Sequence, residues 1–180
     1  MAVPAAFLDR DGVINIDSGY VGRWEEFEYL PDAIEGLKKL QSAGFKLFVV
    51  TNQSGIARGY YTEDDFLLLT ETMTADLAAK GVELSAVYYC PYLEDADLES
   101  YRVTSALRKP EPGMLLKAAH EHDIDLARSV MVGDKASDMI AAERAGVPHR
   151  YHVTSDEPHD ASTKVSSLLE AALDAFQRSI

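Results

Sequence analysis

The chain has 180 residues, a length that fits one domain with a sizeable buried core, and we expect a single domain over 1–180. Its 17 Lys and Arg stand against 30 Asp and Glu, a formal charge of −13, which argues against nucleic acid or an anionic membrane as a partner. The one cysteine excludes an intrachain disulfide and favours a reducing compartment.

Strand-like and helix-like segments alternate along the chain. A first strand is predicted at 5–8, and Pro31 with Asp32 opens a helical pattern that Gly44 ends. Further strands are predicted at 45–50, 86–90, 130–132 and around 149–153, and further helices at 62–80, 112–120, 136–145 and 164–176. This alternation, without hairpin signals, predicts an α/β fold with a doubly wound parallel sheet in three layers. No insertion is large enough for a cap domain, so we expect an open site.

Two carboxylates one residue apart follow the first predicted strand, in the sequence Asp9-Arg10-Asp11-Gly12. Side chains alternate along a strand, so Asp9 and Asp11 project the same way, and Gly12 allows the backbone to turn beneath them. Paired acids of this kind can hold a cation. Asp and Gly are also common residues at strand ends, which is the simpler interpretation of this motif alone.

Polar residues also follow the second and fourth predicted strands. Thr51-Asn52-Gln53-Ser54-Gly55 comes after the second strand, and Gly133-Asp134 comes after the fourth. Parallel sheets bind ligands beyond the carboxyl ends of their strands. These segments are therefore expected to meet at one edge of the sheet, despite their separation in sequence.

These motifs, with Lys109 in Arg108-Lys109-Pro110 and with Asp138, occur in the order found in the haloacid dehalogenase (HAD) superfamily of phosphatases, which the chain resembles over most of its length. The resemblance implies a Rossmann-type HAD fold and a phosphoric monoester hydrolase. Asp9 would be the nucleophile that forms an aspartyl phosphate, and Asp11 would be the general acid and then the general base.

The same resemblance implies roles for the remaining motif residues. Thr51 would contribute a hydroxyl, Asn52 a backbone amide and Lys109 an ammonium group to the phosphoryl oxygens. A magnesium ion would be held by Asp9, by the backbone carbonyl of Asp11 and by Asp134. Asp138 could orient Lys109 or a metal-bound water, although a solvated acid at a helix start is an equally good interpretation.

Within the superfamily, the longer stretches 7–15, 51–59, 108–114 and 131–135 resemble the heptose bisphosphate phosphatases, which remove one phosphate from a bisphosphorylated seven-carbon sugar. Histidinol-phosphate phosphatases are the nearest alternative. Extra cations such as Arg58, Arg108 and Lys135 suit a substrate with two phosphates. By this resemblance, the substrate-binding residues are Asp17, Ser18, Gly19, Tyr20, Asn52, Gln53, Ser54, Arg58, Arg108 and Lys135.

The chain departs from that family in the segment before the basic motif. Its relatives usually carry a zinc site of Cys-x-His followed by Cys-x-Cys, whereas the corresponding residues here are Cys90, Tyr92, Ser105 and Leu107. A structural zinc site needs four N or S donors, so we expect no bound zinc. We expect packing to hold the loop instead, from Tyr88, Tyr92, Leu93, Tyr101 and Val103, with Cys90 as a small buried thiol.

Other features add little or leave alternatives open. His149, His152 and His159 cluster without a motif, and we interpret them as surface or core histidines. No segment approaches the ~20 apolar residues of a membrane helix, and we expect a cytoplasmic monomer that binds a small sugar phosphate, with no membrane or nucleic-acid partner. A catalytically silent phosphate-binding module with this fold is the alternative from a different functional class.

Overall fold

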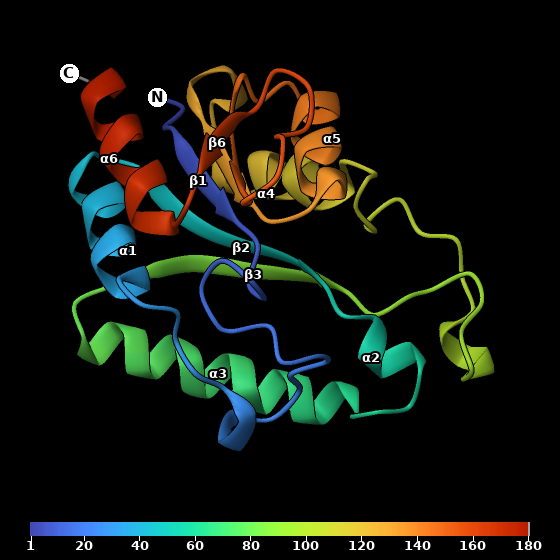
Figure 1. Ribbon diagram of the computed structural model, residues 1–180. Coiled ribbons are helices and arrows are strands. Elements are labelled where there is room, and N and C mark those ends of the chain that lie inside the picture. Colours follow the sequence, from blue (N-terminus) through green and yellow to red (C-terminus); the bar gives the residue numbers. More distant parts are fainter. Residues whose placement is uncertain (180) are drawn as a thin grey trace.

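The computed structural model describes residues 1–179, whose six strands form one parallel sheet in the order β3-β2-β1-β4-β5-β6 (Figure 1). The chain builds one half outward from β1 and then returns to build the other half from β4. This reversal opens a crevice at the carboxyl ends of the two central strands. The strands are β1 (Ala5–Leu8), β2 (Lys46–Asn52), β3 (Leu84–Cys90), β4 (Val130–Gly133), β5 (His149–Val153) and β6 (Thr163–Val165).

Helices cover both faces of the sheet (Figure 1). α1, α3 and α6 pack on one face, and α4 and α5 on the other. They are α1 (Ala33–Ser42), α2 (Ser54–Ala57), α3 (Glu63–Ala79), α4 (Gly113–His122), α5 (Ala136–Ala145) and α6 (Leu168–Ser179), with short 3-10 helices at Trp24–Glu26, Glu99–Tyr101 and Leu126–Arg128. Over residues 1–179, no helix combines the length and the apolar character needed to cross a membrane. The predicted three-layer α/β fold without a large cap is confirmed.

The central strands are apolar throughout because both of their faces are buried. Along β1, Ala6 and Leu8 point into the core beneath α1, α3 and α6, whereas Ala5 and Phe7 point into the core beneath α4 and α5. All four side chains are fully buried. A parallel strand between two helical layers therefore loses the polar alternation of a half-exposed strand, and its first polar residue marks the sheet edge.

The carboxyl-terminal helix prediction was wrong at its start. Residues 163–165 form the edge strand β6, which pairs with β5 between Tyr151 and Thr163, and α6 begins only at Leu168. The Glu170 carboxylate accepts hydrogen bonds from the backbone and hydroxyl of Ser166, which fixes the helix start at this point. The β-branched Thr163 and Val165 suit the strand that precedes it.

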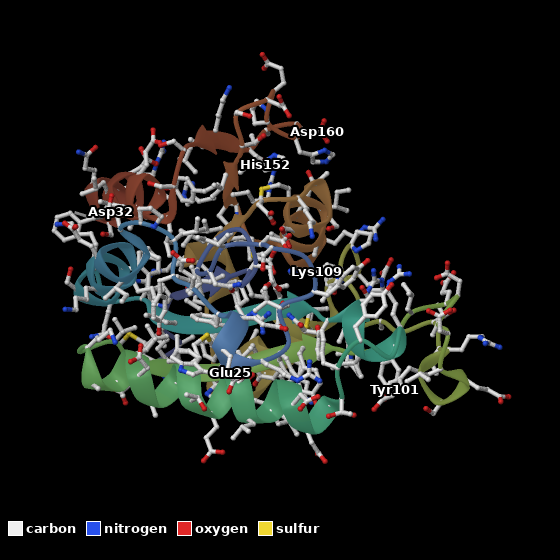
Figure 2. The ribbon with its side chains drawn as sticks, turned by 60° about the horizontal axis from the view of Figure 1, so that its bottom comes forward. Glu25, Asp32, Tyr101, Lys109, His152 and Asp160 are labelled. Carbon is white, nitrogen blue, oxygen red and sulfur yellow. The ribbon has the colours of Figure 1, made fainter. Side chains whose placement is uncertain are left out.

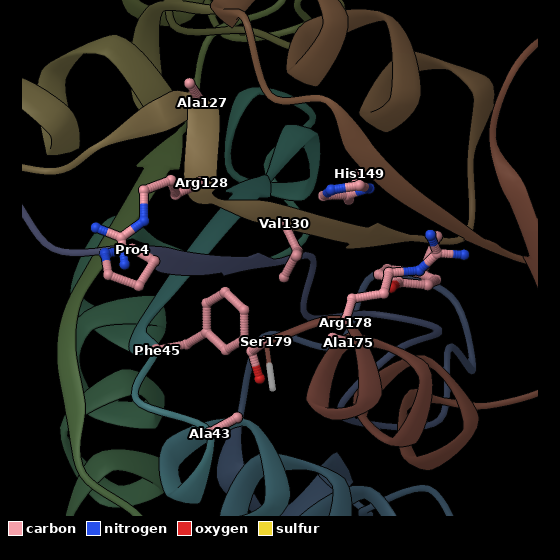
Figure 3. A pocket seen from close by; sticks show the side chains of 11 residues that line it. Pro4, Ala43, Phe45, Ala127, Arg128, Val130, His149, Ala175, Arg178 and Ser179 are labelled. Atoms are coloured by element: carbon pink, nitrogen blue, oxygen red, sulfur yellow. The ribbon is translucent and has the colours of Figure 1, made fainter.

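A cavity of about 340 Å³ lies at the amino end of the sheet (Figure 3). Its floor is apolar, with Phe45 and Val130, and Arg128, His149 and Arg178 stand around it. The Arg178 side chain is already paired with Asp174 at 2.6 Å. The cavity contains none of the predicted site residues, because those follow the carboxyl ends of the strands.

Candidate active site

Asp9 and Asp134 meet because their strands are neighbours at the centre of the sheet. β1 pairs with β4 through Leu8 and Val132, and the Asp9 N–H donates to the Val132 carbonyl at 3.0 Å. Asp138 lies in the first turn of α5, the helix that follows β4. One carboxylate oxygen from each of Asp9, Asp134 and Asp138 lies within 4.8 Å of the other two.

Lys109 joins this group from the 91–110 loop and lies near the centre of the molecule (Figure 2). Its Nζ donates to Asp9 Oδ1 at 3.0 Å and to the Val50 carbonyl at 2.7 Å, and it lies 2.6 Å from Asp138 Oδ1. Burial lowers the pKa of Lys109, which is only 3% exposed, but the charges of Asp138 and Asp9 outweigh burial and raise that pKa. The ammonium group is therefore charged and fully partnered. We call Asp9, Lys109, Asp134 and Asp138 the reaction cluster.

The Asn52 side chain attaches the Lys109 backbone to β2. Asn52 Nδ2 donates to the Lys109 carbonyl at 3.0 Å, and the Lys109 N–H donates to Asn52 Oδ1 at 3.0 Å. The amide is therefore committed to positioning Lys109.

The acids of the reaction cluster fit a hard divalent cation. Asp134 Oδ1 is buried and has no hydrogen-bond partner among the residues that the structure describes. Burial raises the pKa of Asp134 and of Asp9, and the nearby Asp138 carboxylate adds to both increases. Oxygen donors of this kind are the ligands that magnesium prefers, and a bound cation would offset the unfavourable burial of charge.

Gly12 allows the Asp9–Gly12 segment to approach Asp134. Its φ of +83° lies in the left-handed region, and a Cβ built there would come within 2.2 Å of Asp134 Oδ2. Any other residue would push the segment and the carboxylate apart. The sequence suggests Gly12 only as a turn residue, but the close approach to Asp134 also requires a glycine at this position.

Asp11 is held by three side-chain donors. Its Oδ1 accepts from Arg10 at 2.8 Å and from Asn15 at 3.0 Å, and its Oδ2 accepts from Gln53 at 3.1 Å. Thr51 lies at the end of the neighbouring strand β2, and its hydroxyl oxygen accepts from the same Gln53 amide nitrogen at 2.9 Å. The structure thus brings Asp11 and Thr51 together through one glutamine.

A cleft runs over these residues as two adjoining cavities of about 300 and 320 Å³. Asp17, Gly19 and Tyr20 line the first cavity, and Arg108 lines the second together with the reaction cluster residues Asp9, Lys109 and Asp138. Both cavities are lined by Asp11, Asn52, Ser54 and Lys135. Cationic side chains therefore stand along the cleft, beside the acids.

Three of the predicted substrate-binding residues are placed differently from the rest. Ser18 is exposed but does not line either cavity. The Arg58 guanidinium carbon lies 5.8 Å from the centre of the Tyr20 ring, and Arg58 also lines neither cavity. Gln53 lines the first cavity but is only 2% exposed, and its amide contacts protein groups.

Two residues that support the site carry no motif signal. Arg10 is fully buried, and its guanidinium donates to Asp11 and to the Val21 carbonyl, so it ties the first motif to the following loop. His152 on β5 contacts the Asp134 carbonyl through Nε2 at 3.1 Å and accepts from the His159 N–H at Nδ1. His152 therefore steadies the loop after β4, which its sequence surroundings do not reveal.

Hydrogen bonds from Tyr101 and Tyr89 to Glu63, the first residue of α3, fasten the 91–110 loop. The Tyr101 hydroxyl donates to the Glu63 carboxylate at 2.9 Å, and Tyr89 on β3 donates to its other oxygen. We call these three residues the Glu63 clamp. Further along the loop, Arg108 donates to the Tyr92 carbonyl at 3.4 Å.

The packing expected for this loop is partly wrong. Leu93 and Tyr101 do pack in a small cluster with Ala57, but Val103 is 43% exposed and does not hold the loop. Cys90 is fully buried, as predicted, and burial raises the pKa of its thiol. The sequence does not predict the Glu63 clamp, because an acid in the first turn of a helix is common and needs no partner.

Comparison with curated proteins places these motifs among close relatives. The chain is 48% identical over 156 residues to the D-glycero-beta-D-manno-heptose-1,7-bisphosphate 7-phosphatase of Photorhabdus laumondii, a match that covers 87% of this chain and 83% of the relative. It is 45% identical over 172 residues to the phosphatase of the same name from Pasteurella multocida, covering 94% and 93%. Residues 106–163 also match the family model described as HAD-hydrolase-like.

Solved structures agree with this comparison. The D,D-heptose 1,7-bisphosphate phosphatase from B. bronchiseptica, complexed with magnesium and phosphate, superposes with a TM-score of 0.84 at 30% identity and covers 97% of this chain and 99% of that one. The enzyme of the same kind from Burkholderia thailandensis superposes with a TM-score of 0.66 at 27% identity, covering 95% and 97%.

Proposed function

Because the chain belongs to the family of D-glycero-beta-D-manno-heptose-1,7-bisphosphate 7-phosphatases, we propose that it removes the 7-phosphate of that sugar bisphosphate. The observation that carries the proposal is the reaction cluster, in which Lys109 contacts Asp9 and Asp138 beside the unpartnered carboxylate oxygen of Asp134. A phosphate-binding module would not need a buried nucleophile next to a cation site.

The charges at the site explain why a carboxylate can react with an anion here. A phosphate monoester carries close to two negative charges at neutral pH, and each unit charge 4 Å from the Asp9 carboxylate repels it by ~4 kcal/mol at an effective dielectric constant near 20. Lys109 supplies one compensating charge. A magnesium ion held by Asp9, the Asp11 carbonyl and Asp134 would supply two more, and so stabilise the charge on the phosphoryl oxygens.

The reaction proposed for these residues has two displacements. In the first, an Asp9 carboxylate oxygen bonds to phosphorus, the bond from phosphorus to the sugar oxygen breaks, and Asp11 gives that oxygen a proton. In the second, Asp11 takes a proton from water, the water oxygen bonds to phosphorus, and the Asp9–phosphorus bond breaks to release inorganic phosphate. The Thr51 hydroxyl and the Asn52 backbone would contact the phosphoryl oxygens in both steps.

The second phosphate of the substrate is assigned to the remaining cations of the cleft. Arg108 and Lys135 line the cavity that holds the reaction cluster, and Asp17, Gly19 and Tyr20 line the adjoining one. We propose that the sugar spans both cavities. Ser18 and Arg58 line neither cavity, and the Gln53 amide is buried against protein groups, so these three residues would act on the substrate through their neighbours.

Purified protein assayed in Mg²⁺ against heptose 1,7-bisphosphate, histidinol phosphate and 4-nitrophenyl phosphate tests the proposal. We expect the highest kcat/KM for the heptose bisphosphate. A higher kcat/KM for histidinol phosphate would overturn the substrate, and inactivity on all three compounds would favour a silent binding module.

We also propose that the enzyme needs no zinc and acts as a cytoplasmic monomer. Of the residues at the family's zinc positions, only Cys90 is a thiol, and Tyr92, Ser105 and Leu107 offer no nitrogen or sulfur side-chain donor. A single buried thiol suits a reducing compartment. Elemental analysis that finds stoichiometric zinc, or sedimentation that finds a stable dimer, would contradict these assignments.

A further inference from the structure

The Gln53 amide joins two groups that the proposed reaction needs. Its Nε2 donates to Asp11 Oδ2 at 3.1 Å and to the Thr51 hydroxyl oxygen at 2.9 Å. A primary amide nitrogen carries two hydrogens, so both are used. The Thr51 hydroxyl oxygen is an acceptor in this bond, so the hydroxyl keeps its own proton for another acceptor. Its one contact as a donor within residues 1–179 is long, 3.5 Å to the Asn52 carbonyl.

Tyr61 determines which way that amide faces. The Tyr61 hydroxyl donates to Gln53 Oε1, so the amide oxygen points to the phenol and the amide nitrogen points to Asp11. The reversed amide would set its oxygen against the Asp11 carboxylate. Burial raises the pKa of the Tyr61 phenol, so this hydroxyl remains a proton donor at neutral and moderately alkaline pH.

The Tyr61 ring fits a slot that excludes side chains on both sides. A Cβ built at Gly22 would lie 2.1 Å from a ring carbon, and one built at Gly55 would lie 2.3 Å from another. The ring is 4% exposed and sits between the loop before α1 and the helix α2. Two glycines therefore leave room for an aromatic ring whose hydroxyl, among residues 1–179, hydrogen-bonds to the Gln53 amide alone.

The position of Asp11 depends on this contact. Its Oδ1 is occupied by Arg10 and Asn15, and within residues 1–179 its Oδ2 accepts a side-chain hydrogen bond from Gln53 alone. Gln53 thus sets the direction of the one carboxyl oxygen that has spare capacity. An acid that protonates a leaving group must hold its oxygen within hydrogen-bond reach of that group.

We propose that Tyr61 and Gln53 are positioning residues, which orient the Asp11 carboxyl for proton transfer and keep the Thr51 hydroxyl available to the phosphoryl group. This inference rests on the proposed function, because it assumes that Asp11 protonates the departing oxygen. Its signature is dependence on the leaving group. A sugar alkoxide needs that proton, whereas 4-nitrophenolate leaves without it.

The first test is Tyr61→Phe, which removes only the hydroxyl. We compare kcat/KM, which reports only the steps up to departure of the leaving group and so excludes the later hydrolysis, where Asp11 acts on both substrates. We expect kcat/KM on heptose 1,7-bisphosphate to fall roughly tenfold, a fraction of the 10²–10⁴ that a positioned acid–base group supplies, and kcat/KM on 4-nitrophenyl phosphate to change less than twofold. Equal losses on both substrates, or no loss on either, would overturn the proposal. Tyr151→Phe is the matched control, since Tyr151 is 1% exposed and its hydroxyl also donates to a single acceptor, Asp174, far from the cleft.

A second variant separates positioning from general damage to the fold. Gln53→Met keeps the length of the side chain but removes every amide hydrogen bond, and we expect the same leaving-group signature with a larger loss. The double variant Tyr61→Phe/Gln53→Met should match Gln53→Met alone, because Tyr61 acts through Gln53. Additive losses in the double variant would contradict that linkage.

The substrate and the positioning roles can fail separately. Glycerol 3-phosphate serves as a second alkyl ester, measured beside 4-nitrophenyl phosphate in each variant. If the wild-type protein prefers another alkyl phosphate to the heptose bisphosphate, the proposed substrate fails and the ratio of alkyl to aryl activity still tests Tyr61 and Gln53. A ratio that does not change in either variant would overturn the positioning role whatever the natural substrate is.

Discussion

The reaction cluster and the 91–110 loop border the same cleft but are held in different ways. Lys109 lies near the middle of the molecule and Tyr101 at its periphery (Figure 2). The Lys109 ammonium group has three acceptors and is almost fully buried. The loop depends on a small apolar cluster, a few backbone hydrogen bonds and the Glu63 clamp.

This difference separates chemistry from recognition. A buried charge with several partners cannot move without exposing or orphaning another charge, so the reaction cluster has essentially one arrangement. The loop places Arg108 at the cleft, and each hydrogen bond that holds the loop contributes about 1 kcal/mol. Changes in the cluster should therefore affect turnover or folding, and changes in the loop should affect mainly the apparent affinity for substrate.

The largest effect is expected for Asp9→Asn. The amide keeps the size of the side chain but is not a nucleophile toward phosphorus, so kcat should fall roughly 10⁴-fold or more. Steady-state kinetics and a thermal melt of the same preparation would measure this. A folded variant with turnover within tenfold of the wild type would show that Asp9 is not the nucleophile.

Lys109→Met should damage the fold as well as the reaction. It leaves the buried Asp9 and Asp138 carboxylates without their shared cation, a change that costs ~3–5 kcal/mol for a buried ion pair. Urea unfolding would measure the loss. Adding Asp138→Asn should restore part of the stability without restoring activity, and a double variant less stable than Lys109→Met would contradict this electrostatic account.

Gly12→Ala should weaken magnesium binding more than it lowers the stability of the fold. The new Cβ would overlap Asp134, so the Mg²⁺ concentration for half-maximal activity should rise about tenfold, as for other disturbed metal ligands. Gly44→Ala is the matched control, because Gly44 has φ +89° and nothing within 4 Å of its Cβ position. Equal shifts in the two variants would point to backbone strain and not to contact with Asp134.

Short motifs were sufficient to predict the reaction cluster, and the physical reason is local. A buried strand must end in polar residues where it leaves the sheet, so Asp9, Thr51 and Asp134 are each visible beside an apolar run. The parallel topology then brings the strand ends to one edge. The helix at 136–145 was also predicted with both of its ends, because Gly146 marks where it stops, and the strand expected around 149–153 is present.

The supporting contacts could not be predicted because they join residues far apart in sequence with no periodic pattern. Tyr61, His152 and Glu63 act through single hydrogen bonds that only the folded chain brings together. The strand at 163–165 was missed because three residues are too few to show the alternation of polar and apolar side chains that marks a strand. The longer helical pattern that follows was therefore extended over them. Long-range contacts, not propensities, determine these parts.

Glu63→Gln tests the loop side of the comparison and should have the smallest effect. One carboxylate oxygen becomes an NH₂ group, so either Tyr89 or Tyr101 loses its acceptor and the loop that carries Arg108 loosens. KM for the bisphosphate should rise roughly threefold to tenfold, the effect of about 1 kcal/mol, while kcat stays within twofold of the wild type.

Glu71→Gln is the matched control for this variant, because Glu71 is an exposed acid on the same helix. Arg108→Ala provides the link to the cleft, since adding Glu63→Gln to a chain without the Arg108 guanidinium should raise KM little further. If Glu63→Gln instead lowered kcat at constant KM, the loop would belong with the reaction cluster. The division between a fixed chemical centre and an adjustable recognition loop would then not hold for this enzyme.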